Sequence, residues 1–164
     1  MSAELIDCSE KINKDSCSYY LCAEENRKCG NSGYLLGFGY TICQKFLTMD
    51  TSSYTDQGKK WLSDVRYELQ KSVENIPIQY DCEQLRKAAF EVHVPVYRKT
   101  GFCKLNPLDR YQIYYSLRGV LLNPETIING FNIIESCVED RGGWYFFSSD
   151  QNYDGNEKNT DEER

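Results

Sequence analysis

The feature that most constrains this chain is its set of eight cysteines in 164 residues. An even number of cysteines, without any of the Cys-x-x-Cys pairs typical of zinc sites, indicates a disulfide framework. The chain has a single histidine, His93, so nitrogen ligands for zinc are scarce as well. Because disulfides persist in oxidising compartments, we predict a secreted protein, extracellular or periplasmic. Spacing alone does not select one pairing among the many that these cysteines allow.

The N-terminus does not carry the export signal that secretion requires. Residues 1–7 contain neither the basic segment nor the apolar segment of a signal peptide. Secretion therefore implies that a signal was removed or lies outside this chain. An intracellular helical protein with reduced thiols is the alternative that this observation leaves open.

Charge and hydropathy narrow the class of partner. The formal net charge of −6 disfavours nucleic acid, whose phosphates would be repelled, and an anionic membrane surface. No apolar run reaches the length of about 18 residues that a membrane span needs. We therefore expect a protein partner or receptor, no nucleic acid and no membrane span.

Apolar residues recur at helical spacing through most of the chain. The clearest pattern predicts a helix from Gly58 to Asn75, with apolar side chains at four-residue steps. Phe38, Ile42 and Phe46 have the same spacing and predict a second helix within residues 34–47. Few stretches alternate as strands do, so the fold class is all-α. The apolar face of the clearest helix consists of Trp61, Val65, Leu69 and Val73.

Capping residues mark further helices. Asp81 and Gln84 have the spacing of a capping box, and Pro95 should end or kink the helix that follows. Asn-Pro pairs at 106–107 and 123–124 predict helix starts, because Asn caps and Pro fits the first turn. These signals predict helices over 108–122 and 125–139, in addition to a short helix over 18–29.

The C-terminal part combines an aromatic cluster with a polar end. We expect Trp144, Tyr145, Phe146 and Phe147 to fold back on the helices, or to bind a partner if they are not packed. We accordingly predict one helical domain over 1–147 and an acidic, disordered tail over 148–164.

That tail contains a pattern typical of a calcium-binding loop. Acidic and amide residues alternate around Gly155, as in an EF-hand, where calcium takes oxygen ligands. The twelfth position is an aspartate, and only three residues follow it. The sequence predicts no required cofactor, and calcium is the one candidate; a chance match in an acidic tail is the simpler interpretation. The predicted ligands are Asp150, Asn152, Asp154, Asn156 and Asp161.

No catalytic residues are predicted. His93 has no nucleophile or carboxylate at a suggestive spacing, so a partly buried histidine at a helix end is the simpler interpretation. Glu68 belongs to a lysine-rich helix face and is expected to be solvated. Tyr111, Tyr114 and Tyr115 share one predicted helix, where core packing explains most of them and a binding surface the rest.

The ordered cysteine-rich motifs resemble the stanniocalcin family over residues 8–137. The segments that carry the resemblance are CSYYLCAEENRKC, GYTICQKFL, YTDQGKKWL, YDCEQLRKAAFEVHVPVYRKTGFCKLNP and IIESC. The resemblance implies a secreted, hormone-like helical protein that regulates without catalysis, through calcium balance or through a protease or receptor. A small secreted disulfide-rich helical enzyme, or a toxin-like effector, is the alternative hypothesis.

The resemblance also implies a disulfide pairing. Three bridges tie down the N-terminal region, and the fourth is expected to close a hairpin of the last two helices. One further family bridge falls near Glu68 and Val96, neither of which is cysteine, and the family's intermolecular cysteine has no counterpart. We therefore expect no disulfide-linked dimer, while a non-covalent dimer stays open. The implied pairs are Cys8–Cys22, Cys17–Cys43, Cys29–Cys82 and Cys103–Cys137.

Overall fold

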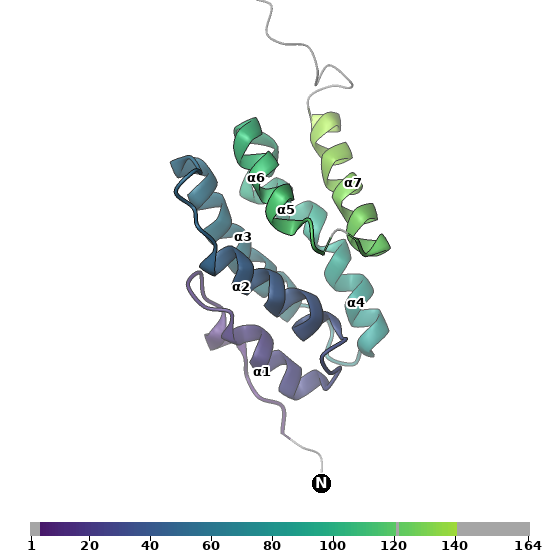
Figure 1. Ribbon diagram of the computed structural model, residues 1–164. Coiled ribbons are helices and arrows are strands. Elements are labelled where there is room, and N and C mark those ends of the chain that lie inside the picture. The colour runs from purple at the N-terminus through teal and green to yellow at the C-terminus, as the bar shows by residue number, and fades with distance from the viewer. Residues whose placement is uncertain (1–3, 121, 141–164) are drawn as a thin grey trace, which may run out of the picture.

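The fold consists of helices packed side by side, which confirms the predicted all-α class. A computed structural model describes residues 4–120 and 122–140, and no strand occurs among them. Figure 1 shows α1 at the N-terminal end, α2 and α3 next to it, and α7 beside α5 and α4. The helices are α1 (Ser18–Arg27), α2 (Thr41–Thr48), α3 (Asp56–Glu74), α4 (Cys82–Glu91), α5 (His93–Thr100), α6 (Pro107–Leu117) and α7 (Pro124–Asp140), with short helical segments η1 (Ser9–Lys11), η2 (Leu35–Tyr40) and η3 (Phe102–Lys104).

All eight cysteines are paired, in the four pairs that the family resemblance implies. Cys8–Cys22 and Cys17–Cys43 attach the N-terminal segment to α1 and α2, and Cys29–Cys82 joins the end of α1 to the start of α4. Cys103–Cys137 joins η3 to α7. The expected hairpin closure is therefore wrong, because Cys103 precedes α6 and α7 packs against α5.

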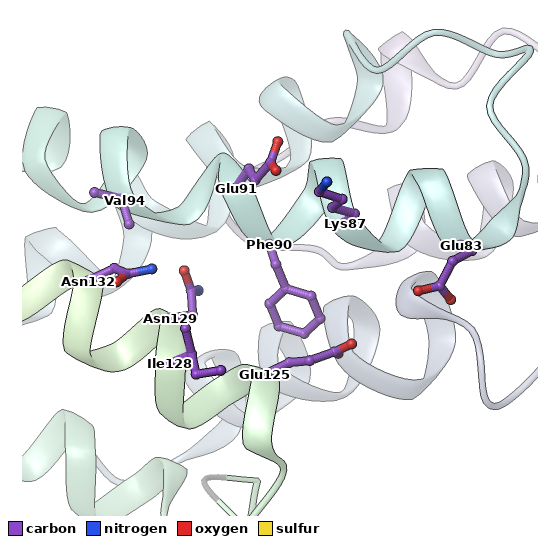
Figure 2. A pocket seen from close by; sticks show the side chains of 9 residues that line it. All are labelled: Glu83, Lys87, Phe90, Glu91, Val94, Glu125, Ile128, Asn129 and Asn132. Atoms are coloured by element: carbon purple, nitrogen blue, oxygen red, sulfur yellow. The ribbon is translucent and has the colours of Figure 1, made fainter.

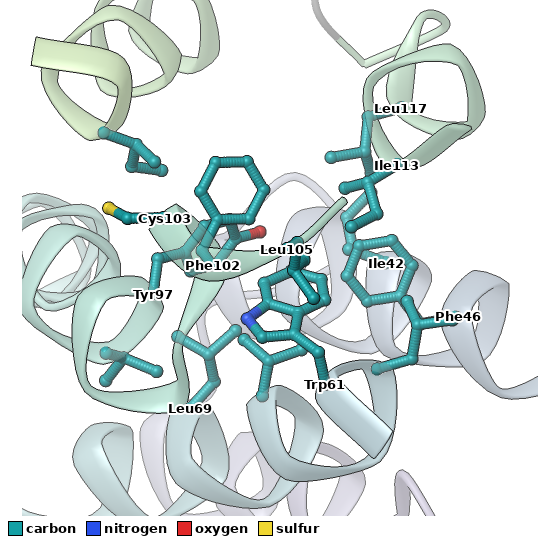
Figure 3. Packing of buried hydrophobic residues seen from close by; sticks show 14 of the residues in the cluster. Ile42, Phe46, Trp61, Leu69, Tyr97, Phe102, Cys103, Leu105, Ile113 and Leu117 are labelled. Carbon is teal, nitrogen blue, oxygen red and sulfur yellow. The ribbon is translucent and has the colours of Figure 1, made fainter. Parts of the chain in front are cut away.

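The central helix is α3, as its apolar periodicity predicts. Its apolar stripe from Trp61 to Val73 is buried, and it contacts α1, α2 and α5. The Thr55 hydroxyl accepts a hydrogen bond from the Gly58 N–H and caps the first turn. Figure 3 shows the Trp61 indole enclosed by side chains from several helices, including Tyr97 and Phe102.

Two buried polar side chains of α3 hold the N-terminal segment in place. The Arg66 guanidinium donates to the carbonyls of Lys14 and Phe46. The Gln70 side chain donates to the Asn13 and Ser16 carbonyls and accepts from the Asn13 N–H. A segment without regular structure thus has its backbone groups satisfied by α3.

The predicted helix over 34–47 begins in a wider form. Residues 35–40 form a π-helical segment that leads without interruption into α2. Gly39 lies against the Tyr20 ring, and a Cβ at this position would come within 2.6 Å of Tyr20 Cε1. Glycine at this position lets the Tyr20 ring approach the backbone, and the low helix propensity of Gly37 and Gly39 favours a departure from regular α-helix.

The region around Pro95 shows the interruption that was predicted, an end or a kink of the helix that Asp81 caps. The Asp81–Gln84 capping box is present, but α4 ends at Glu91 and a separate helix, α5, begins at His93. Proline clashes with the carbonyl four residues before it, which here is that of Glu91. Pro95 therefore stops α4 and occupies the first turn of α5, where it is tolerated.

The helices that follow start at the predicted Asn-Pro pairs. The Asn106 side chain caps α6, and the Asn123 side chain accepts from the Glu125 N–H at the start of α7. However, α6 ends at Leu117, so its predicted extension to residue 122 is wrong. Residues 118–120 form turns around Gly119, which favours leaving a helix.

One buried carboxylate anchors α6 to α3. Asp109 is fully buried and accepts from both the backbone N–H and the hydroxyl of Thr55. A Cβ at Gly58 would come within 2.6 Å of the Asp109 carboxylate, so only glycine fits there without a shift. The Gln-Gly-Lys motif of the sequence thus contains the residue that allows α6 to dock.

Candidate partner-binding groove

A groove lies between α4 and α7 in the described part of the chain. Its volume is about 440 Å³. One wall comes from α4 and the start of α5, and the other from successive turns of α7 (Figure 2). The lining residues of each wall recur three or four positions apart, and residues at that spacing share one face of a helix. The lining residues are Glu83, Lys87, Phe90, Glu91, Val94, Glu125, Ile128, Asn129 and Asn132.

The groove combines an apolar floor with a polar rim. The Phe90 ring points from α4 toward α7, and Val94 and Ile128 add aliphatic surface (Figure 2). Carboxylates and amides surround this floor, with Lys87 as the cation among the lining residues. Such a site suits an apolar side chain with neighbouring hydrogen-bond donors or positive charge.

An ion pair joins the two walls. Arg86 Nη2 lies 2.6 Å from Glu125 Oε2, and Arg86 Nε donates to the same oxygen. The guanidinium also lies over the Phe90 ring, 5.5 Å from its centroid. These contacts fix the orientation of Phe90 in the groove.

Behind Phe90, an aromatic cluster encloses His93. The His93 ring stacks on Phe90 and meets Tyr34, Phe38 and Tyr97. Its Nδ1 lies 2.8 Å from the Ala89 carbonyl, which can only accept, so Nδ1 carries the proton. Burial lowers the pKa of His93 to about 4. His93 is thus fully buried rather than partly so, and it does not line the groove.

A second hollow, of about 410 Å³, lies between the N-terminal segment, α1 and the end of α3. Its main cation, Arg27, donates to the carbonyls of Ile76, Pro77 and Ile78. The guanidinium therefore stabilises the loop that connects α3 with α4. Because these donors are occupied within the chain, the groove between α4 and α7 is the better candidate site.

Two carboxylates of α3, Asp64 and Glu68, form ion pairs at the surface. Asp64 pairs with Lys14 and Lys60, and Glu68 pairs with Lys99 of α5. Glu68, which was expected to be solvated, is therefore partly shielded, with 21% of its side chain exposed. Glu24 accepts from the Gly30 N–H, a contact that helps to close the end of α1.

The three tyrosines of α6 have different environments. Tyr114 is half-buried against Phe102, whereas Tyr111 and Tyr115 are exposed and stacked on each other. Arg118 covers the Tyr115 ring at 3.9 Å. Only one of the three therefore contributes to the core.

Several predictions concern residues that the structure does not describe. The predicted calcium ligands Asp150, Asn152, Asp154, Asn156 and Asp161 lie outside the described residues, as does the predicted domain boundary after residue 147. The aromatic residues Trp144, Tyr145, Phe146 and Phe147 lie outside them too. Both sites stay predictions.

Two searches of the described part of the chain had negative results. Within 4–120 and 122–140, no group of three or more His, Cys, Asp or Glu side chains could hold a metal ion. None of the helices there is both long enough and apolar enough to cross a membrane.

The groove residues were not among the predicted site residues. Phe90 and Val94 read as core positions, and Ile128 as one of several isoleucines in an apolar helix. The available signal was the pair Asn129 and Asn132, two amides one turn apart in that helix. Comparisons with protein families, with curated proteins and with solved structures find no match to this chain.

Proposed function

We propose that this chain is a secreted, stanniocalcin-like regulatory protein that binds a protein partner through the groove between α4 and α7. The observation that carries the proposal is the groove itself, with an apolar floor from Phe90, Val94 and Ile128 inside a polar rim. The partner identity would decide whether the regulation concerns calcium balance, a protease or a receptor.

The disulfides support the secreted part of the proposal. All eight cysteines are paired, and such bridges are stable in oxidising compartments. The pairing is also the one that the resemblance implies, which supports a stanniocalcin-like protein. A different pairing would have counted against it.

The groove supports binding rather than catalysis as the mode of action. The enzyme hypothesis would place its base at His93, whose ring is buried behind Phe90 and does not line the groove. The charged residues on the rim of the groove indicate the kind of partner that would bind there. Glu83 and Glu91 are exposed on either side of Lys87, so we propose a partner segment with an apolar side chain and neighbouring Lys or Arg residues.

The test is selection of binders from a displayed peptide library on the oxidised protein. Enriched peptides should combine an aromatic or aliphatic residue with basic residues. Their affinity should fall at least tenfold for the double variant Glu83→Lys, Glu91→Lys, since reversing two rim charges changes attraction into repulsion, a change of about 1.4 kcal/mol or more.

The matched control is Glu10→Lys with Glu25→Lys, which makes the same change of charge at exposed positions on η1 and α1. Peptides that bind both variants as tightly as the unmodified protein would contradict the proposed groove. Enrichment of acidic peptides would contradict the proposed partner chemistry.

A further inference from the structure

One flank of α7 carries an apolar stripe that no other described element covers. Ile127, Phe131 and Ile134 are 41%, 67% and 43% exposed, and the half-buried Val138 continues the line. The spacing of four, three and four residues places these side chains along one side of the helix. Contiguous exposed apolar surface of this kind usually has an occupant.

The stripe is distinct from the other two faces of α7. The core face consists of Thr126, Ile133, Ser136 and Cys137, which are buried. The groove face consists of Glu125, Ile128, Asn129 and Asn132. At about 100° per residue, the stripe and the groove face lie on opposite flanks of the core face. The stripe is therefore not part of the proposed partner site.

We propose that the chain's own aromatic segment, Trp144–Phe147, packs antiparallel along this stripe. The stripe reaches Val138, two residues before the last described residue, so it begins where the chain continues. The connecting residues Arg141, Gly142 and Gly143 include two glycines, which allow a sharp reversal of direction.

The length of the aromatic segment matches the length of the stripe that it would cover. From Ile127 to Val138 the helix rises about 16 Å, at about 1.5 Å per residue. Four extended residues span about 13 Å, and the three-residue connection spans at most about 10 Å. The aromatic segment can thus reach Ile134 and Phe131 without any change in α7.

The short connection explains why this occupant is preferred over a second molecule. A tether of a few residues holds the segment at an effective concentration in the millimolar range, and closing so short a loop costs little entropy. A second copy of the chain, or another protein, would have to compete with this segment at its own much lower concentration.

Tryptophan fluorescence tests the proposal, because the chain has two tryptophans, Trp61 and Trp144. Trp61 is buried, with 2% exposure. The difference between the full oxidised chain and its Trp144→Phe variant isolates the Trp144 signal. We expect Trp144 to emit at short wavelength and to be several-fold less quenched by acrylamide than a free tryptophan derivative, at concentrations where sedimentation shows a monomer.

Substitution within the stripe should release the segment. Phe131→Asp should raise the quenching of Trp144 several-fold and shift its emission to longer wavelength, and the milder Ile134→Gln should do so in part. Tyr111→Asp is the matched control, since Tyr111 is 64% exposed on α6 and should leave Trp144 unchanged. Circular dichroism of each variant checks that the helices are retained.

Three results would overturn the proposal. A fully quenchable Trp144 in the monomer would leave the stripe without this occupant. Protection that appears only with dimer formation would assign the stripe to a second copy. Protection that neither Phe131→Asp nor Ile134→Gln reduces would place the segment elsewhere on the molecule.

Discussion

The N-terminal and C-terminal parts of the molecule are stabilised in different ways. Three disulfides, together with Arg27, Arg66 and Gln70, hold η1, α1 and the connections around them. The part from α6 to α7 has one disulfide, Cys103–Cys137, and its exposed surface includes large apolar side chains. Irregular backbone therefore needs covalent and polar attachment, whereas regular helices can rely on packing.

The two parts of the molecule also contribute differently to the groove between α4 and α7. The strongly attached N-terminal part provides a fixed support for α4, which forms one wall of the groove. The other wall is α7, whose attachments are the bridge from Cys137, the Arg86–Glu125 ion pair and its packing on α5 and α4. The width of the groove therefore depends on the less strongly attached part of the molecule.

The strongest test of the comparison is removal of one disulfide from each part. The Cys29–Cys82 and Cys103–Cys137 bridges span 53 and 34 residues of sequence. By the chain-entropy relation, replacing either pair with alanine should lower the free energy of unfolding by about 4 kcal/mol. Denaturant titration without reductant measures this loss.

The same two variants should differ in which backbone amides lose their protection from hydrogen exchange. Hydrogen exchange should show α7 exposed without Cys103–Cys137 while α1 and α3 keep their protection. Loss of Cys29–Cys82 should reduce protection throughout. If α7 stays protected without its bridge, packing alone holds it and the comparison breaks down.

The attachment of α6 should depend on its buried carboxylate. Asp109→Ala removes the buried carboxylate that accepts from the Thr55 N–H and hydroxyl. We expect a loss of about 3 kcal/mol in the free energy of unfolding, the usual cost of breaking such a buried charged contact. Thermal and denaturant unfolding would measure it.

The control for Asp109 is Asp56→Ala, which removes an exposed carboxylate from the first turn of α3. A loss of a few tenths of a kcal/mol is expected there, from the helix dipole alone. Equal losses in the two variants would mean that Asp109 has no anchoring role.

Acid should weaken the packing around His93, whose ring contacts Tyr34 before η2 and Tyr97 of α5. The folded pKa is about 4, below the ordinary value of 6.5, so the unfolded chain binds the proton more readily. Stability should therefore fall as pH decreases from about 6.5 to about 4. Between pH 7 and pH 5 the expected loss is about 2 kcal/mol.

Urea titrations at a series of pH values measure this dependence, with His93→Phe as the comparison variant. Because His93 is the only histidine, the variant should show a nearly flat profile between pH 5 and pH 7. An unchanged slope would assign the titration to another group.

The parts that could be predicted from sequence are those that depend on local rules. The α3 stripe, the Asp81–Gln84 capping box and the Asn-Pro starts each depend on neighbours within one or two turns. The disulfide pairs came from the resemblance to a family and not from spacing. The close approach of Gly39 to the Tyr20 ring could not be predicted, because the two residues belong to separate elements.

The groove could not be predicted for a related reason. Its walls are far apart in sequence, and their meeting depends on the break between α4 and α5 at Pro95 and on the packing of α7 against α5. Pro95 signals the break in the sequence, but the packing of α7 against α5 has no periodic signature. His93 shows the same limit, since its burial results from rings contributed by η2, α4 and α5 and its neighbours Val92 and Val94 give little sign of them.

The smallest expected effects come from the ion pairs that link segments in each part. Asp64 accepts from Lys14, which is half exposed, so Asp64→Asn should cost about 0.5 kcal/mol and less at high salt. Glu125→Gln breaks a contact with the better shielded Arg86 and should cost about 1 kcal/mol. Unfolding titrations at low and at about 1 M salt measure both losses of stability, since screening acts mainly on exposed charges.

The two variants should also differ in hydrogen exchange. Glu125→Gln should increase the exchange of α7 amides near the groove, whereas Asp64→Asn should leave α1 and η1 protected by their disulfides. If Asp64→Asn loosens the N-terminal segment as much as Glu125→Gln loosens α7, the bridges do not dominate that part, and the two regions are stabilised in the same way.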